Sequence, residues 1–209
     1  MGTSAAKENI LKRIRQALSN PVPLPFPLSE GVASVYQPAK NDLEILFAEE
    51  FNQLQGKFAF CTDEADLLLQ IQQLVSQKGW SKIYCTEDRW NLSFSNTIHL
   101  PSCDASVTGC EYLVARTGTI VMSAAQQSGR TVSVYAPIHI CIAYTNQLVY
   151  DIKDALQSLK DRYADNIPSL ITFASGPSRT ADIEKTLVTG VHGPKEVYLF
   201  LVDSDGATS

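Results

Sequence analysis

The alternation of short apolar segments with a helical segment is the feature that most restricts the fold of this chain. Residues 57–61 (KFAFC) and 82–85 (KIYC) have the length and composition of short buried strands. Between them, apolar residues over positions 67–75 repeat with helical period, and Thr62 or Asp63 can cap the start of that helix. A strand–helix–strand order predicts a parallel sheet with right-handed crossovers, and therefore an α/β fold.

Further elements continue this order along the chain. Predicted strands cover residues 118–123, 138–144, 169–174 and 196–202, and predicted helices cover residues 43–54, 151–163 and 181–188. The strand over 169–174 (SLITFA) is uniformly apolar, which is typical of a buried parallel strand. Residues 90–100 are predicted to form a turn and a short strand. The expected architecture is a Rossmann-like, mostly parallel sheet flanked by helices.

The N-terminal part has a different composition. Residues 5–18 predict a helix with one apolar face, and residues 20–27 alternate proline with other residues, which forces an extended path. We therefore expect an N-terminal helix with a proline-rich arm over residues 1–30 and an α/β domain over residues 31–209. The arm is either a stiff spacer or a segment that packs on another subunit, and an exposed helix is compatible with a homodimer.

Charge and cysteine content narrow the class of function. The net charge of −5 and the lack of a basic block argue against nucleic-acid binding. Neither a signal peptide nor a membrane span is expected, which predicts a cytoplasmic protein. The five cysteines form no C-x-x-C pair, so we expect buried thiols and no metal or cofactor bound by this chain alone.

Polar residues suited to chemistry gather after the predicted strand over 169–174. In an open α/β sheet, ligands bind where loops leave the carboxyl ends of strands, and a following helix offers free N–H groups to an anion. The alternative is that these residues only cap the helix. The candidate ligand-binding residues of this loop are Ser175, Gly176, Ser178, Arg179, Thr180, Asp182 and Glu184.

Three other groups of residues complete the candidate site. His192 and Gly193 follow the predicted helix, and a histidine on a loop is suited to proton transfer, so His192 is the candidate catalytic residue. A second group, Thr117, Gly118 and Thr119, presents hydroxyls and N–H groups that suit a carboxylate or phosphate, unless it is only a tight turn. Arg130 follows a glycine turn and could also reach an anion, whereas His139 lies within a predicted strand and is expected in the core.

These segments together resemble the lactate-utilisation (LUD) domain family, specifically its lactate utilization protein C group. The run SGPSRTADIEKTLVTGVHGP over residues 175–194 is the longest and most specific likeness. RTGTIV over 116–121, Ser128–Arg130 followed by Pro137-Ile-His139, and ENILKRIRQAL over 8–18 also resemble it. One departure is Arg116, which stands where the family often has an acid before the Thr-Gly-Thr turn.

The resemblance implies a fold similar to the ribose-phosphate isomerase, glucosamine-phosphate deaminase and CoA-transferase group. It also implies a non-redox subunit of a system that oxidises L-lactate to pyruvate beside partner proteins that carry iron–sulfur clusters. In that role, Arg130 or Arg179 would pair with the lactate carboxylate and His192 would accept its hydroxyl proton. The alternatives are a stand-alone enzyme acting on a phosphorylated or CoA-linked substrate, and a metabolite-binding regulatory or assembly module.

Overall fold

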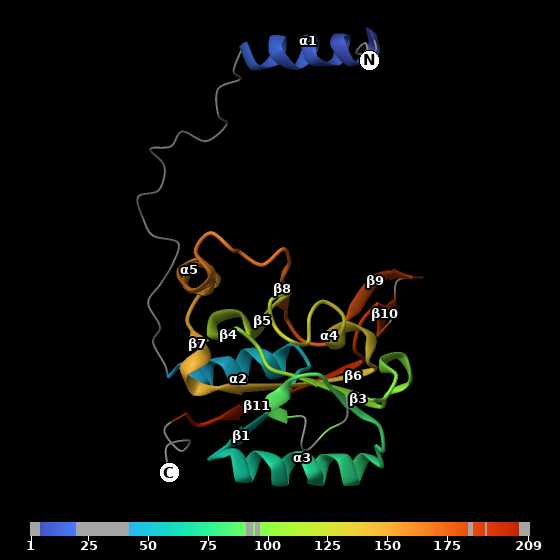
Figure 1. Ribbon diagram of the computed structural model, residues 1–209, viewed down its shortest axis with the longest axis vertical. Helices are drawn as coiled ribbons and strands as arrows, with labels where there is room; N and C mark the ends of the chain where they lie inside the picture. The colour runs from blue at the N-terminus through green and yellow to red at the C-terminus, as the bar shows by residue number, and fades with distance from the viewer. Residues whose placement is uncertain are drawn as a thin grey trace. The chain divides into compact units, whose positions relative to one another are not determined.

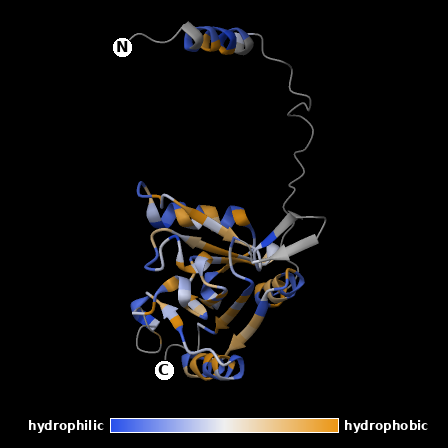
Figure 2. Ribbon diagram, turned by 90° about the vertical axis from the view of Figure 1, so that its right-hand side faces the viewer, coloured by the Kyte–Doolittle hydropathy of each residue, from blue (hydrophilic) through white to orange (hydrophobic). Residues whose placement is uncertain are grey.

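The computed structural model describes residues 5–19, 42–90, 94, 97–183, 186–190 and 192–204. The chain divides into two units, Met1–Pro38 and Ala39–Ser209. The first contains helix α1 (Ala5–Ser19), on which Ile10, Leu11 and Ile14 are exposed. Figure 2 shows hydrophobic and hydrophilic residues side by side on this helix. None of the helices in the described part of the chain is long and apolar enough to cross a membrane.

The second unit is built on a five-stranded parallel sheet, here called the central sheet (Figure 1). Its strands lie in the order β1-β11-β6-β3-β2, and every neighbouring pair is parallel. The predicted α/β class with a mostly parallel sheet flanked by helices is therefore confirmed. The bounds are β1 Lys57–Cys61, β2 Ile83–Cys85, β3 Ala105–Thr108, β6 Ile138–Tyr144 and β11 Glu196–Val202. The two strands predicted over residues 57–61 and 82–85, β1 and β2, lie at opposite edges of the central sheet. The strands β11, β6 and β3 lie between them.

Helix α3 (Glu64–Lys78) covers one face of the central sheet. Asp63 caps its start by accepting a hydrogen bond from the Asp66 N–H at 2.8 Å, and Gly79 ends it in the left-handed region with a φ of 67°. Leu67 and Ile71, one turn apart, are buried against the sheet. The predicted cap at the start of this helix is confirmed.

The opposite face of the central sheet packs against helix α2 (Leu43–Gln53) and a four-stranded second sheet. The second sheet has the order β7-β4-β5-β8, with bounds β7 Leu148–Val149, β4 Tyr112–Val114, β5 Thr119–Ser123 and β8 Ile171–Ala174. Phe47 and Phe51 of α2 are fully buried between the two sheets. Helix α5 (Ile152–Tyr163) packs on the outer face of the second sheet through Ala155 and Leu159, so the layers follow one another from α3 to α5 (Figure 1).

Two predictions about the segment after residue 168 are wrong. Strand β8 is not a buried parallel strand: it pairs antiparallel with β5 at one edge of the second sheet, and its Phe173 is exposed. The predicted helix over residues 181–188 is instead an antiparallel pair, β9 (Arg179–Ile183) with β10 (Thr186–Thr189). The β-branched residues of this stretch explain the error, because they favour extended backbone over helix.

The remaining described elements are short. Helix α4 covers Val132–Tyr135, and single 3₁₀ turns cover Asp88–Trp90, Leu100–Ser102, Ala115–Thr117 and Thr145–Gln147. The short strand predicted within residues 90–100 falls partly outside the described residues. The strands β3, β4 and β7 were not predicted, since each has four residues or fewer and carries too weak a period to be read from sequence.

Candidate functional site

The carboxyl ends of the five parallel strands meet at one edge of the central sheet, where a polar pocket of about 400 Å³ lies. We call it the carboxyl-edge pocket. Ligands of open α/β sheets bind at this edge. Its lining comes from the segments that directly follow β2, β3, β6 and β11, together with the turn after β5 and the end of α5. The lining residues are Glu87, Arg89, Trp90, Gly109, Cys110, Gln126, Ile142, Tyr144, Asn146, Gln147, Arg162 and Ser204.

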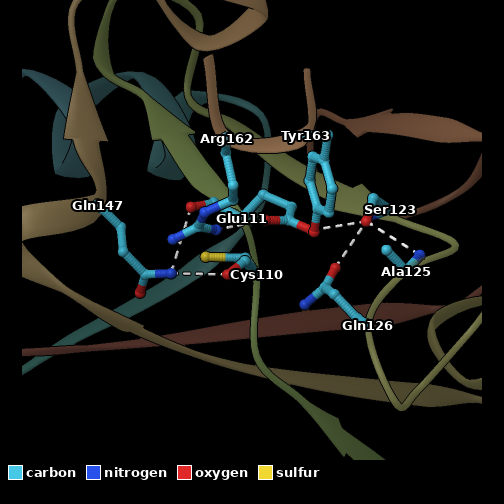
Figure 3. A network of polar contacts seen from close by, with 8 residues as sticks. All are labelled: Cys110, Glu111, Ser123, Ala125, Gln126, Gln147, Arg162 and Tyr163. Atoms are coloured by element: carbon cyan, nitrogen blue, oxygen red, sulfur yellow. Dashed lines mark hydrogen bonds and ion pairs between the residues drawn. The ribbon is translucent and has the colours of Figure 1, made fainter. Parts of the chain in front are cut away.

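Arg162 enters this pocket from α5 and is anchored by the buried carboxylate of Glu111 (Figure 3). Glu111 is 2% exposed and accepts hydrogen bonds from Arg162 Nη1 at 2.6 Å, Tyr163 Oη at 2.7 Å and Ser123 Oγ at 2.6 Å. Burial and the bond to Glu111 raise the pKa of the Tyr163 phenol, so it stays protonated and donates. A buried carboxylate needs such partners, and here they fix the direction of the Arg162 guanidinium.

Arg89 is held in a similar way on another side of the pocket. Its guanidinium pairs with Glu64 and lies 4.4 Å from the centre of the Tyr144 ring. Burial would raise the pKa of Glu64, but Arg89 and the Tyr144 hydroxyl outweigh it and lower that pKa. The side chains of Arg89 and Arg162 are 54% and 52% exposed. A guanidinium has five N–H donors, so each keeps donors for a ligand after binding one carboxylate.

Glu87 and Gln147 hold the backbone around the pocket. Glu87 accepts a hydrogen bond from the Gly109 N–H at 2.8 Å. Gln147 donates to the Cys110 carbonyl at 2.6 Å, while its own side-chain oxygen accepts from the Tyr144 N–H at 2.8 Å. Gln147 therefore ties the segment after β3 to the end of β6, and Glu87 ties the same segment to the loop after β2.

The predicted Thr-Gly-Thr turn and the loop after β8 do meet, but at the C-terminal end of α2 rather than at the carboxyl-edge pocket. The Thr119 hydroxyl lies 2.8 Å from that of Thr117 and 2.7 Å from that of Ser175. We call residues 117–119 and 175–179 the α2-packing loops. The hydroxyl chain links the start of β5 to the end of β8.

Two glycines let these loops approach α2 closely. Gly118 has a φ of 54°, and a Cβ there would lie 2.6 Å from the Phe51 nitrogen. Gly176 has a φ of 80°, and a Cβ there would lie 2.5 Å from the Leu54 carbonyl oxygen. Arg179 donates to the same Leu54 carbonyl. Only glycine fits both the backbone conformation and the space, so packing alone explains these two residues.

The helix N-terminus that was expected to bind an anion after Arg179 does not form, because β9 begins there. Thr180 and Asp182 lie in β9, and Glu184 lies outside the described residues. The alternative that this stretch caps a helix is therefore wrong for Thr180 and Asp182. Ser178 instead takes part in backbone pairing: its N–H donates to the Pro194 carbonyl and its carbonyl accepts from the Gly190 N–H, both at 2.9 Å.

His192 and Gly193 lie beside Ser178 of the α2-packing loops. They line a separate hollow of about 570 Å³ with Pro137, Tyr135 and Lys195. Since Pro137 precedes β6 and Lys195 precedes β11, this hollow is at the amino ends of the parallel strands, opposite the carboxyl-edge pocket. The two predicted loops do lie side by side, because a Cβ on Gly193 would lie 2.9 Å from the Ser178 Cβ, but they lie away from the carboxyl-edge pocket.

Arg130 and Arg116 both have structural partners. Arg130 is exposed and donates to Ser169 Oγ at 2.5 Å. Arg116, which departs from the family pattern, pairs with Asp151 at the start of α5. Burial would raise the pKa of Asp151, but the Lys153 N–H and Arg116 outweigh it and lower that pKa.

His139 is a core residue, as expected from its place in a strand. It is 1% exposed, its Nε2 lies 2.8 Å from Thr108 Oγ1, and burial lowers its pKa to about 4. The ring is therefore neutral near neutral pH. Over the described part of the chain, no three histidine, cysteine, aspartate or glutamate side chains converge as metal ligands.

Sequence reasoning did not single out the residues of the carboxyl-edge pocket. Most of them stand a few residues beyond a strand, whereas Ile142 and Tyr144 lie within β6 and Arg162 lies within α5. The signal that could have found them is positional: Glu87, Gly109, Gln147 and Ser204 each closely follow a strand of the parallel sheet.

Comparison with known proteins supplies the family. Residues 95–202, slightly more than half of this 209-residue chain, match the LUD domain. An uncharacterized protein of Neisseria meningitidis is 31% identical over 118 residues, covering 56% of this chain and 48% of its own length. Lactate utilization protein C of Bacillus licheniformis is 39% identical over 100 residues, covering 46% of this chain and 42% of that protein. The chain thus spans about half the length of these relatives.

A longer match and a solved structure agree with this. Lactate utilization protein C of Anoxybacillus flavithermus is 25% identical over 186 residues, covering 79% of this chain and 83% of that protein. The crystal structure of a DUF162 family protein from Deinococcus radiodurans has a TM-score of 0.58 at 17% identity, covering 79% of this chain and 99% of that one. The likeness to this solved structure supports the fold alone. From its match to the family model, this chain belongs to the LUD domain family.

Proposed function

We propose that this chain serves in lactate utilization by binding the lactate carboxylate in the carboxyl-edge pocket. Relatives named lactate utilization protein C support the role. The observation that carries the proposal is the presence of two half-exposed guanidinium groups, Arg89 and Arg162, in one pocket at the ligand-binding edge of the sheet. A planar guanidinium matches a carboxylate through two parallel N–H···O bonds.

The chain would act as a non-redox protein beside partners that carry iron–sulfur clusters, where L-lactate is oxidised to pyruvate. Its own residues would hold the substrate: Arg162 and Arg89 pair with the carboxylate, and Glu87 can accept a hydrogen bond from the lactate hydroxyl. The fixed positions of Glu111 and Glu64 support this, because they orient both guanidinium groups before a ligand arrives. Electron transfer would belong to the partners.

Calorimetric titration of L-lactate into the purified chain and into two arginine variants tests this. Arg162→Lys keeps a positive charge for Glu111 but removes the planar fork, so lactate affinity should fall about tenfold to a hundredfold. Arg179→Lys, in the α2-packing loops, is the matched comparison and should change affinity less than about twofold. Lactate binding that depends on Arg179 and not on Arg162 would instead favour the site predicted from sequence. Failure of the unmodified chain to bind lactate would contradict the proposal.

A second candidate, an assembly module, is favoured by helix α1. Ile10 and Ile14 are 59% and 49% exposed on one face of this helix. Apolar residues arranged in this way often contact another protein. If residues 1–30 serve assembly, their removal should abolish copurification with partner proteins while lactate titration is unchanged. Loss of lactate binding in that truncation would count against a separate assembly role.

A further inference from the structure

Two cysteines of one core cluster lie on neighbouring strands near the carboxyl-edge pocket. Cys110 follows β3, lines the pocket and is 7% exposed. Cys141 lies in the middle of β6 and is fully buried. Both side chains belong to the core cluster between the two sheets, and the Cys110 thiol contributes to raising the pKa of Cys141. One thiol is thus next to the pocket and the other lies directly behind it.

The backbone holds this pair in place. Cys141 lies opposite Thr108 in the parallel ladder between β3 and β6, and neighbouring strands are about 4.8 Å apart. Cys110 stands two residues beyond Thr108, where the Gln147 side chain binds its carbonyl at 2.6 Å. The sheet register and the Gln147 hydrogen bond therefore hold the two cysteines in fixed positions on neighbouring strands.

The environments of the two thiols differ in a way that matters for chemistry. Burial, and after it the Cys110 thiol, raise the pKa of Cys141 well above its ordinary value. An oxidant in solution reacts with an accessible thiolate and does not reach a fully buried thiol. Cys110 is the member of the pair that an oxidant in the pocket can reach, and Cys141 is placed to resolve the product.

We propose that Cys110 and Cys141 form a reversible intramolecular disulfide when a peroxide enters the carboxyl-edge pocket. Cys110 attacks one peroxide oxygen as the O–O bond breaks, giving a sulfenic acid and water. The Cys141 sulfur then attacks the Cys110 sulfur, the S–O bond breaks, and the hydroxide released takes the Cys141 proton to form a second water. The two thiols are oxidised by two electrons in all, and the peroxide is reduced.

Mass spectrometry of the full chain after treatment with hydrogen peroxide tests this. The protein should lose the mass of two hydrogen atoms, a peptide map without reductant should join the peptides of Cys110 and Cys141, and dithiothreitol should reverse both changes. The readout involves no lactate, so it is independent of the proposed function. An unchanged mass, a disulfide between other cysteines, or irreversible addition of oxygen to Cys110 in the unmodified chain would overturn the proposal.

Two variants separate a specific pair from general thiol oxidation. Cys141→Ala should stop at the sulfenic acid on Cys110, which dimedone labels, and should show no disulfide. Cys61→Ala is the control, because Cys61 is equally buried in a strand of the same sheet but belongs to the other core cluster. It should form the Cys110–Cys141 bond at the rate of the unmodified chain. If Cys141→Ala does not fold, Cys110→Ser with an intact Cys141 should leave the remaining thiols unoxidised at the same dose.

Discussion

The carboxyl-edge pocket and the α2-packing loops use polar residues in opposite ways. In the α2-packing loops, Gly118 and Gly176 allow backbone to approach α2, and the hydroxyls bind one another. In the pocket, single residues from several strand ends converge, and two guanidinium groups keep free donors. The run over residues 175–194, which carries the clearest family likeness, therefore includes residues that serve close packing against α2. The site best suited to a ligand is instead assembled from residues that share no motif.

This comparison predicts that changes in the α2-packing loops alter stability, and that changes in the pocket alter binding. The largest expected effect is on Gly118. Gly118→Ala should lower the free energy of unfolding by about 3–4 kcal/mol, because the new Cβ meets backbone and the φ is positive. Urea unfolding followed by circular dichroism measures it.

Gly79→Ala is the matched control for that variant. Gly79 also has a positive φ, of 67°, but a Cβ there meets nothing within 4 Å. Its cost should be about 1 kcal/mol, from backbone strain alone. Equal losses in the two variants would mean that the close approach to α2 contributes nothing, and the distinction between the two regions would weaken.

The next largest expected effect is the loss of stability at low pH that His139 of β6 causes. The pKa of His139 is about 4 in the folded protein and about 6.5 when unfolded, so the unfolded state binds more protons between these values. The stability that the neutral ring contributes is complete above pH 6.5 and is lost as pH falls toward 4. Between pH 7 and pH 5 the loss should be about 2 kcal/mol in urea unfolding.

His139→Gln tests that assignment, because glutamine can still bind the Thr108 hydroxyl but does not titrate. The variant should be less stable at pH 7 yet lose little further stability down to pH 5. The carboxyl groups with lowered pKa values, such as Glu64 and Asp151, act at lower pH, since their ordinary values are 4.5 and 3.8. A variant that keeps the full loss between pH 7 and pH 5 would show that another group is responsible.

The smallest expected effect, that of Thr119→Val, tests most directly whether the α2-packing loops serve stability and the carboxyl-edge pocket serves binding. Thr119→Val removes the central hydroxyl of the chain that joins Thr117 to Ser175 and keeps the shape of the side chain. The free energy of unfolding should fall by about 1 kcal/mol, and lactate affinity should stay within about twofold of the original. Thr119→Ser, which keeps the hydroxyl, should recover most of the stability. A large loss of lactate affinity in Thr119→Val at retained stability would move the binding site to these loops.

Local patterns in the sequence were sufficient to predict those helices and strands whose ends and composition depend on neighbouring residues. Asp63 and Gly79 mark the ends of α3 because capping depends on residues within one turn. The strands β1, β5, β6 and β11 were predicted because each is a compact apolar run. The same reasoning failed over residues 181–188, where a helical spacing of apolar residues competed with β-branched composition, and pairing between β9 and β10 decided the outcome.

The sequence by itself determined the α/β class, the parallel core strands and the family likeness, since these depend on residue type and spacing along the chain. Only the tertiary structure decided which polar residues meet. It assigned β5 and β8 to a second sheet, placed His192 at the amino ends of the parallel strands, and brought Arg89 and Arg162 into one pocket. The physical reason is that strand order is set by non-local pairing and burial, which residues far apart in sequence determine together.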